Sequence, residues 1–140
     1  MQLNFDSSNG ADTSTELAKK EEWNDGDVVK FEVLNADLLE VVKDGSSRLK
    51  AHFVLKVLSG ANEGRNTLKD VWDPIANKGS QGYLKHLLAA MGVTQEKLNG
   101  GNVPLAMADA VGGHFHGTCR KLNGGKWVNW EDLTNETASR

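Results

Sequence analysis

Over residues 27–58, apolar and polar positions alternate in the manner of β-strands. Residues 27–42 are rich in β-branched side chains, which favour a long strand over a helix. A Lys43-Asp44-Gly45-Ser46 turn follows, and residues 48–58 then alternate more cleanly, with Leu49, Ala51, Phe53, Leu55 and Val57 on one face. The two segments predict a β-hairpin across the Asp-Gly turn.

The remaining pattern predicts three further strands and one main helix. After a turn-rich loop at 59–65, residues 66–72 are expected to form a third strand. Apolar residues recur at helical spacing over Gln81–Met91, with Ser80 as the expected N-cap and Gly92 at the end. Residues 94–99 are expected to form a short helical turn capped by Thr94, and residues 103–111 either a helix or a packed loop. Residues 114–122 and 126–133 are expected to form a second hairpin.

This order of elements is typical of a mainly β fold. Five antiparallel strands with a helix between the third and fourth favour the five-stranded barrel called the oligonucleotide/oligosaccharide-binding fold, or OB-fold. Barrel closure would also protect the edges of such short strands. A β-sandwich offers no obvious place for the helix, and a ferredoxin-like fold needs a helix after the first strand, where the 43–47 link is too short.

The chain has 140 residues, which predicts a single domain. We expect an acidic N-terminal arm at 1–26, the OB-fold domain at 27–133 and a short polar tail at 134–140. No apolar run approaches the roughly 20 residues that cross a bilayer, and the N-terminus lacks a signal-peptide pattern. A cytoplasmic protein without a membrane partner is therefore expected.

The net charge of −3 conceals an uneven distribution. Residues 1–42 hold three Lys against ten acidic residues, and residues 127–140 hold one Arg against three. The middle, 43–126, holds twelve Lys and Arg against six acidic residues, together with all four His. A basic middle between acidic ends allows a polyanionic partner, although charges that merely solvate different faces produce the same pattern.

Motifs for catalysis and metal binding are missing. The chain has no GxSxG, GxxxxGK, GxGxxG or HExxH, so we expect no enzymatic activity and no cofactor. The single Cys119 excludes an internal disulfide. His114, His116 and Cys119 have ligand chemistry, but on a strand the two His share one face while the Cys points to the other, so no metal site is predicted.

Cationic residues interleaved with aromatic ones are the most informative constellation. Single-stranded nucleic acid binds to a positive groove that follows its phosphates and to aromatic faces on which bases stack. Phe31, Phe53, Phe115 and Tyr83 fall at core positions, whereas at least one of Trp127 and Trp130 should be exposed because they cannot share a strand face. The candidate DNA-binding residues are Arg48, Lys50, His52, Lys56, Arg65 and Lys69 for phosphates, Trp72 for stacking, and Arg120 and Lys121 as additions. Lys and Arg on the outside of a barrel without any ligand are the simpler alternative.

The segment from Gly26 to Leu133 resembles small phage-encoded single-stranded-DNA-binding proteins of replication and recombination modules. The likeness is carried by an ordered set of features: the opening NFD, GD-V-x-F-E, FVLKVLSGANEGR, NTLKDVWDP, YLKHLLAAMGV, EKLNGG and the closing strand pair. The resemblance implies an OB-type barrel that coats and protects single-stranded DNA with little sequence preference. It also implies phage or host replication and recombination enzymes as partners, and the barrel could act as a monomer or a homodimer.

One departure concerns the end of the chain. Many single-strand binders carry a long acidic C-terminal tail with an apolar last residue, whereas this chain ends EDLTNETASR. The acidic N-terminal segment is a candidate replacement, competing with DNA or contacting a partner enzyme. The alternatives from other classes are a phage structural or accessory protein whose exposed aromatics anchor protein interfaces, and a carbohydrate-binding barrel that would be insensitive to salt.

Overall fold

The computed structural model describes residues 23–122 and 127–136. Residues 1–22 of the N-terminal arm expected at 1–26 lie outside the described residues. So do the expected turn at 123–126 and residues 137–140 of the expected tail. The elements are β1 (Val28–Lys43), β2 (Ser46–Val57), β3 (Asn66–Trp72), α2 (Lys78–Ala90), α3 (Gln95–Asn99), α4 (Val103–Ala110), β4 (His114–Leu122) and β5 (Trp127–Asn135).

The five strands form one antiparallel sheet in the order β3-β2-β1-β4-β5. The mainly β fold, with its helices between the third and fourth strands, is therefore confirmed. Closure into a barrel is not observed, because β3 and β5 are the two edges and no ladder joins them within the described strands. Side chains occupy the gap instead: Lys69 Nζ of β3 donates to Asn129 Oδ1 of β5 at 3.5 Å. We call this gap the β3–β5 seam.

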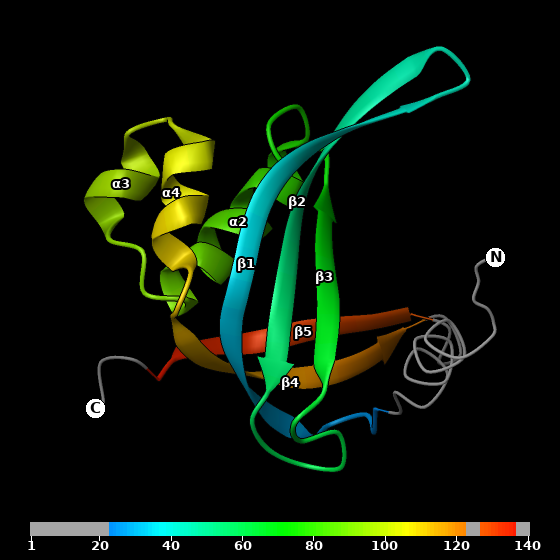
Figure 1. Cartoon of the computed structure of the whole chain (residues 1–140), viewed down its shortest axis with the longest axis vertical. Coiled ribbons are helices and arrows are strands. Elements are labelled where there is room, and N and C mark those ends of the chain that lie inside the picture. The colour runs from blue at the N-terminus through cyan, green and yellow to red at the C-terminus, as the bar shows by residue number, and fades with distance from the viewer. Residues whose placement is uncertain (1–22, 123–126, 137–140) are drawn as a thin grey trace, which may run out of the picture.

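The first hairpin forms as predicted and is longer than expected. β1 and β2 pair from Phe31 with Val57 to Lys43 with Ser46. Asp44 and Gly45 both have positive φ, which is the geometry of a two-residue type I′ turn. A bulge between Val33 and Asn35 shifts the register and bends β1. The hairpin tip projects beyond the rest of the sheet (Figure 1).

The core lies between one face of this coiled sheet and the helices. Phe31 and Phe115, predicted as core, are stacked with centroids 5.2 Å apart, and Phe53 is also buried. Trp130 meets Phe31 edge-on at 4.9 Å, and Trp23 approaches Trp130 at 5.0 Å. These rings bury large apolar areas, which is why β1, β4 and β5 pack closely here.

The helices α2, α3 and α4 lie together beside the sheet (Figure 1). α2 begins at Lys78 rather than Gln81, and its N-cap is Asn77, not Ser80: the Ser80 backbone N–H donates to Asn77 Oδ1 at 3.0 Å. The alternative left open for 103–111 is decided in favour of a helix, because Asn102 caps it and Pro104 fits its first turn. No helix among the described residues is long and apolar enough to cross a bilayer.

Gly113 permits the closest approach between the helices and the sheet. A Cβ at this position would lie 1.9 Å from the Met91 carbonyl oxygen at the end of α2. The Val33 N–H also donates to the Gly113 carbonyl at 2.9 Å, beside the bulge of β1. The end of α2, the start of β4 and the middle of β1 therefore meet at one glycine.

Burial of one face of β1 can be tested with two neighbouring valines. Val29 is 4% exposed and faces the core, whereas Val28 is 59% exposed on the other face. We expect Val29→Ala to lower the free energy of unfolding by about 2 kcal/mol more than Val28→Ala, since both lose the same strand preference but only one loses burial. Urea denaturation measures both variants, and equal losses would contradict the assigned faces.

Candidate functional site

An exposed tryptophan lies next to two cations on the outer face of the sheet, opposite the core. Trp72 ends β3, pairs directly with Lys50 of β2 and is 37% exposed. The Arg48 guanidinium carbon lies 4.7 Å from the centroid of the indole, and Lys50 Nζ lies 5.1 Å from it. Both distances are within the range of cation–π attraction. We call Trp72, Arg48 and Lys50 the Trp72 platform.

Acidic residues accompany the platform. Arg48 forms a forked pair with Asp73, with Nη2 to Oδ2 at 2.6 Å and Nε to Oδ1 at 3.3 Å. This hydrogen bonding lowers the pKa of Asp73 and raises that of Arg48. Asp70 accepts from Lys50 Nζ at 3.1 Å and lies 2.6 Å from His52 Nδ1. The β2–β3 register brings both aspartates against these cations.

Further along the same face the character changes from charged to apolar. Val54 of β2 pairs with Leu68 of β3, which is 62% exposed. Lys56 follows at the far end of β2, opposite Asn66 on one side and Glu32 on the other. Lys56 is therefore eight residues from Arg48, a distance of about 26 Å along an extended strand.

Arg65 lies in the loop that enters β3. Its Nη1 is buried and has no hydrogen-bond partner among the described residues. A buried guanidinium nitrogen without an acceptor is uncommon, because its desolvation is not compensated. Arg65 and Lys56 thus form a second basic region at the end of the sheet away from the Trp72 platform.

Lys69 is on the wrong face for the groove predicted from sequence. Residues 66, 68, 70 and 72 of β3 face outward, while Lys69 shares the inward parity of the buried Thr67 and Val71. Its ammonium reaches the β3–β5 seam, where it lies 5.2 Å from the Tyr83 ring centroid and contacts Asn129. Burial lowers the pKa of Lys69. Lys69 therefore belongs to the seam and not to the Trp72 platform.

The two candidates on β4 lie apart from the platform. Arg120 pairs across the ladder with Asn129, and its guanidinium lies 3.5 Å from Glu131 and 3.8 Å from Asp132. Lys121 is exposed, and its backbone N–H donates to Asp25 Oδ1 at 2.8 Å. β1 separates this part of the sheet from β2, so one continuous outer groove through all nine predicted residues does not form.

The histidines of β4 and the cysteine face opposite ways, as predicted. His114 lies 3.9 Å from Glu32, and His116 contacts Glu136, both on the outer face. Cys119 is fully buried on the inner face, and burial raises the pKa of its thiol. Among residues 23–122 and 127–136, no three His, Cys, Asp or Glu side chains converge as metal ligands.

The other aromatic predictions have mixed outcomes. Trp130 is buried, and the side chain of Trp127 lies outside the described residues, so the exposed member of that pair stays a prediction. Tyr83 packs partly against the core, and its hydroxyl donates to the Trp130 carbonyl at 2.9 Å. Burial raises the pKa of Tyr83 to about 12. Tyr83 thereby fastens α2 to β5 at the seam.

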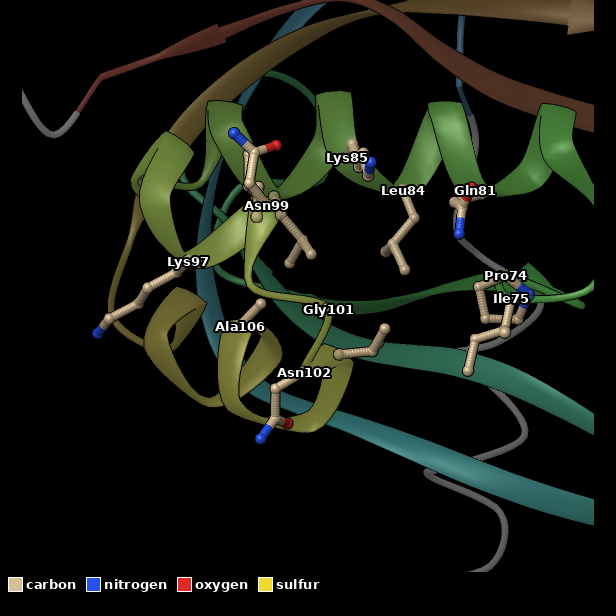
Figure 2. A pocket seen from close by; sticks show the side chains of 13 residues that line it. Pro74, Ile75, Gln81, Leu84, Lys85, Lys97, Asn99, Gly101, Asn102 and Ala106 are labelled. Atoms are coloured by element: carbon tan, nitrogen blue, oxygen red, sulfur yellow. The ribbon is translucent and has the colours of Figure 1, made fainter.

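A separate apolar groove of about 190 Å³ lies among the helices. Figure 2 shows Leu84 of α2 pointing into the space between α2 and the α3–α4 segment, with Pro74 and Ile75 at one end. Lys85 and Lys97 stand on its rim, and Lys97 is already paired with Asp109 at 2.9 Å. This groove is distinct from the Trp72 platform.

Sequence reasoning missed Asp70, Asp73 and Asn129 as members of these sites. Each acquires its role from pairing between strands that are distant in the chain. A cross-strand alignment of residues 48–52 with 70–73 would have placed the two aspartates beside the cations. No comparable signal in the sequence points to Asn129.

The Arg48–Asp73 pair has a testable titration. In the folded protein the pKa of Asp73 is below its ordinary value, because Arg48 donates to the carboxylate. The pair therefore stabilises the fold above the ordinary pKa, and this contribution is lost as the pH falls through the lowered pKa. Arg48→Met should raise the pKa of Asp73, measured by carboxyl ¹³C NMR against pH. Arg120→Met is the control, and an unshifted Asp73 pKa in R48M would contradict the pairing.

Comparison with known proteins adds no assignment to this geometry. No protein-family model matches the chain, and no curated protein matches it significantly.

Proposed function

We propose that this protein binds single-stranded DNA with little sequence preference, as a non-enzymatic coating protein. The observation that carries the proposal is the Trp72 platform, an exposed indole with Arg48 and Lys50 within cation–π distance on the outer face of β2 and β3. An aromatic face stacks on any base, and flanking cations contact the phosphates on either side of it. The combination suits a single strand better than a duplex, whose bases are already stacked.

The topology supports an OB-type assignment. An OB-fold is a five-stranded, partly open barrel that binds oligonucleotides on its strand 2–3 face. The order β3-β2-β1-β4-β5, with the helices inserted before β4, agrees with such a barrel opened along the β3–β5 seam. The Trp72 platform lies on β2 and β3, which is the face that this assignment requires.

The carboxylates near the platform fit reversible binding. Exposed ion pairs contribute little to stability, so Arg48, whose side chain is 55% exposed, loses little when a phosphate replaces part of its contact with Asp73. Arginine has five N–H donors, and the two hydrogen bonds from Arg48 to Asp73 use only part of this capacity.

The biological setting follows from the resemblance described above. In this proposal the protein protects single strands during phage replication or recombination in the host cytoplasm. Phage or host enzymes of those processes are its protein partners, and DNA is bound without a cofactor.

A structural or accessory protein is the second candidate. It is favoured by the apolar groove among the helices and by Val42, which is 68% exposed near the tip of the β1–β2 hairpin. Apolar surfaces of this kind anchor protein interfaces. This candidate predicts assembly in the absence of DNA, visible as a higher molar mass in light scattering.

Titration with an unlabelled poly-thymidine oligonucleotide tests the proposal directly. We expect tryptophan fluorescence to be quenched, with affinity falling as salt rises, and a duplex of equal length to have a much smaller effect. No change in fluorescence or electrophoretic mobility at low salt would overturn single-strand binding and leave the interface candidate.

The role of Trp72 has a specific expected magnitude. Trp72→Ala should weaken binding of the oligonucleotide by about 1 to 3 kcal/mol, a factor of about 5 to 150 in Kd, because the stacking face is lost. Leu68→Ala removes another exposed side chain from the same face of the same strand and is the control. Fluorescence anisotropy of a labelled oligonucleotide measures both, and similar losses would contradict stacking on Trp72.

A further inference from the structure

The β3–β5 seam contains a depression of about 360 Å³. Its lining includes four consecutive residues of β3, from Lys69 to Trp72, together with the first turn of α2, Tyr83 and Asn129. Because successive residues of a strand point to opposite faces, a lining of both parities places the depression over the free edge of β3. Trp72 borders it, so the depression is continuous with the Trp72 platform.

Lys69 is the charged group inside this depression. Its ammonium is partly buried, and burial lowers its pKa, because desolvation disfavours the charged form. Nζ donates to the side-chain oxygen Oδ1 of Asn129 at 3.5 Å and lies 5.2 Å from the centroid of the Tyr83 ring, and both of these groups are neutral. Asp70 adds a weaker attraction from the other side of β3, where it is already engaged by Lys50 and His52. Among the described residues, no carboxylate forms an ion pair with Lys69, whereas Arg48 and Lys50 each have one.

The carboxylates around the depression are paired with cations. Asp70, which lines it, is engaged by Lys50 and His52 on the outer face of the sheet. Glu131 and Asp132, which follow Asn129 on β5, lie 3.5 and 3.8 Å from the Arg120 guanidinium. The first turn of α2, which faces the depression through Gly79 and Ser80, contains no acidic residue.

We propose that the seam is a phosphodiester-binding subsite, in which a strand stacked on Trp72 crosses the edge of β3 and places its next phosphate against Lys69 Nζ. Asn129 orients the ammonium, and its amide N–H group is a second donor to the phosphate. This inference rests on the proposed function and specifies the path of the strand. Arg120, which pairs with Asn129 across the β4–β5 ladder, lies on the continuation of that path.

Lys69→Met tests the subsite. It removes the charge and keeps a flexible side chain of similar length, and thermal unfolding verifies that the variant folds. We expect a weaker affinity for a poly-thymidine oligonucleotide by a factor of about 5 to 10, since a charge-assisted contact is lost. The negative slope of log K against log salt should become shallower by about 0.7, the value for one phosphate contact on a single strand. Lys69→Arg keeps the charge and should retain most of the affinity.

Lys85→Met is the matched control, because Lys85 is an exposed lysine of α2 that does not line the depression. If wild type binds and K69M matches K85M in affinity and salt slope, the subsite is overturned while the proposed function stands. If wild type binds no oligonucleotide, both proposals are overturned.

The protonation of Lys69 is a second readout that a purely structural role would not change. In ¹³C-lysine NMR the Lys69 signal, identified by its loss in K69M, should titrate at lower pH than exposed lysines. Saturation with the oligonucleotide should raise the pKa of Lys69, because a phosphate stabilises the charged form. An unchanged pKa in the saturated complex would overturn the subsite.

Discussion

The burial of Phe31 is the constraint on which the arrangement of the sheet depends. This residue belongs to two ladders at once, opposite Val57 of β2 and opposite Phe115 of β4. Its ring is fully buried against Phe115 and Trp130. One side chain therefore connects the β2–β3 half of the sheet with the β4–β5 half, and β1 belongs to both. The bulge after Val33 allows the rest of β1 to pair with β2 alone. The sheet coils as a result, and its two edges approach each other at the seam.

The candidate sites are consequences of this coiling. The β2–β3 ladder places Trp72 beside Lys50 on the outer face, and the approach of the edges brings Lys69 to Asn129. Tyr83 holds α2 against β5 at the same place through the Trp130 carbonyl. A side-chain bridge therefore stands where a closed barrel would have backbone hydrogen bonds, and this leaves room for the depression.

Local patterns predicted most of the elements and fewer of the contacts. The bounds of β3 and β4, and the Asp44-Gly45 turn, are confirmed because alternation and turn chemistry are local properties. The start of α2 was misplaced because Asn77 and Ser80 are both good caps and only the observed hydrogen bond distinguishes them. Lys69 was grouped with Lys50 because residue spacing within β3 does not say which of its residues lie on the same face of the sheet as Lys50. Barrel closure failed for the same reason, since it depends on non-local geometry.

Pairing of the outer cations with carboxylates has a kinetic consequence. At physiological salt the Debye length is about 8 Å, so paired charges of this kind project little field beyond the surface. The chain also carries a net charge of −3, so a polyanion approaching it is not electrostatically accelerated. Under the proposed function, the association rate constant with single-stranded DNA belongs to the unsteered range of about 10⁵ to 10⁷ M⁻¹s⁻¹. The proposal then assigns discrimination among polyanions to the lifetime of the complex, in which an unstacked base reaches the Trp72 indole.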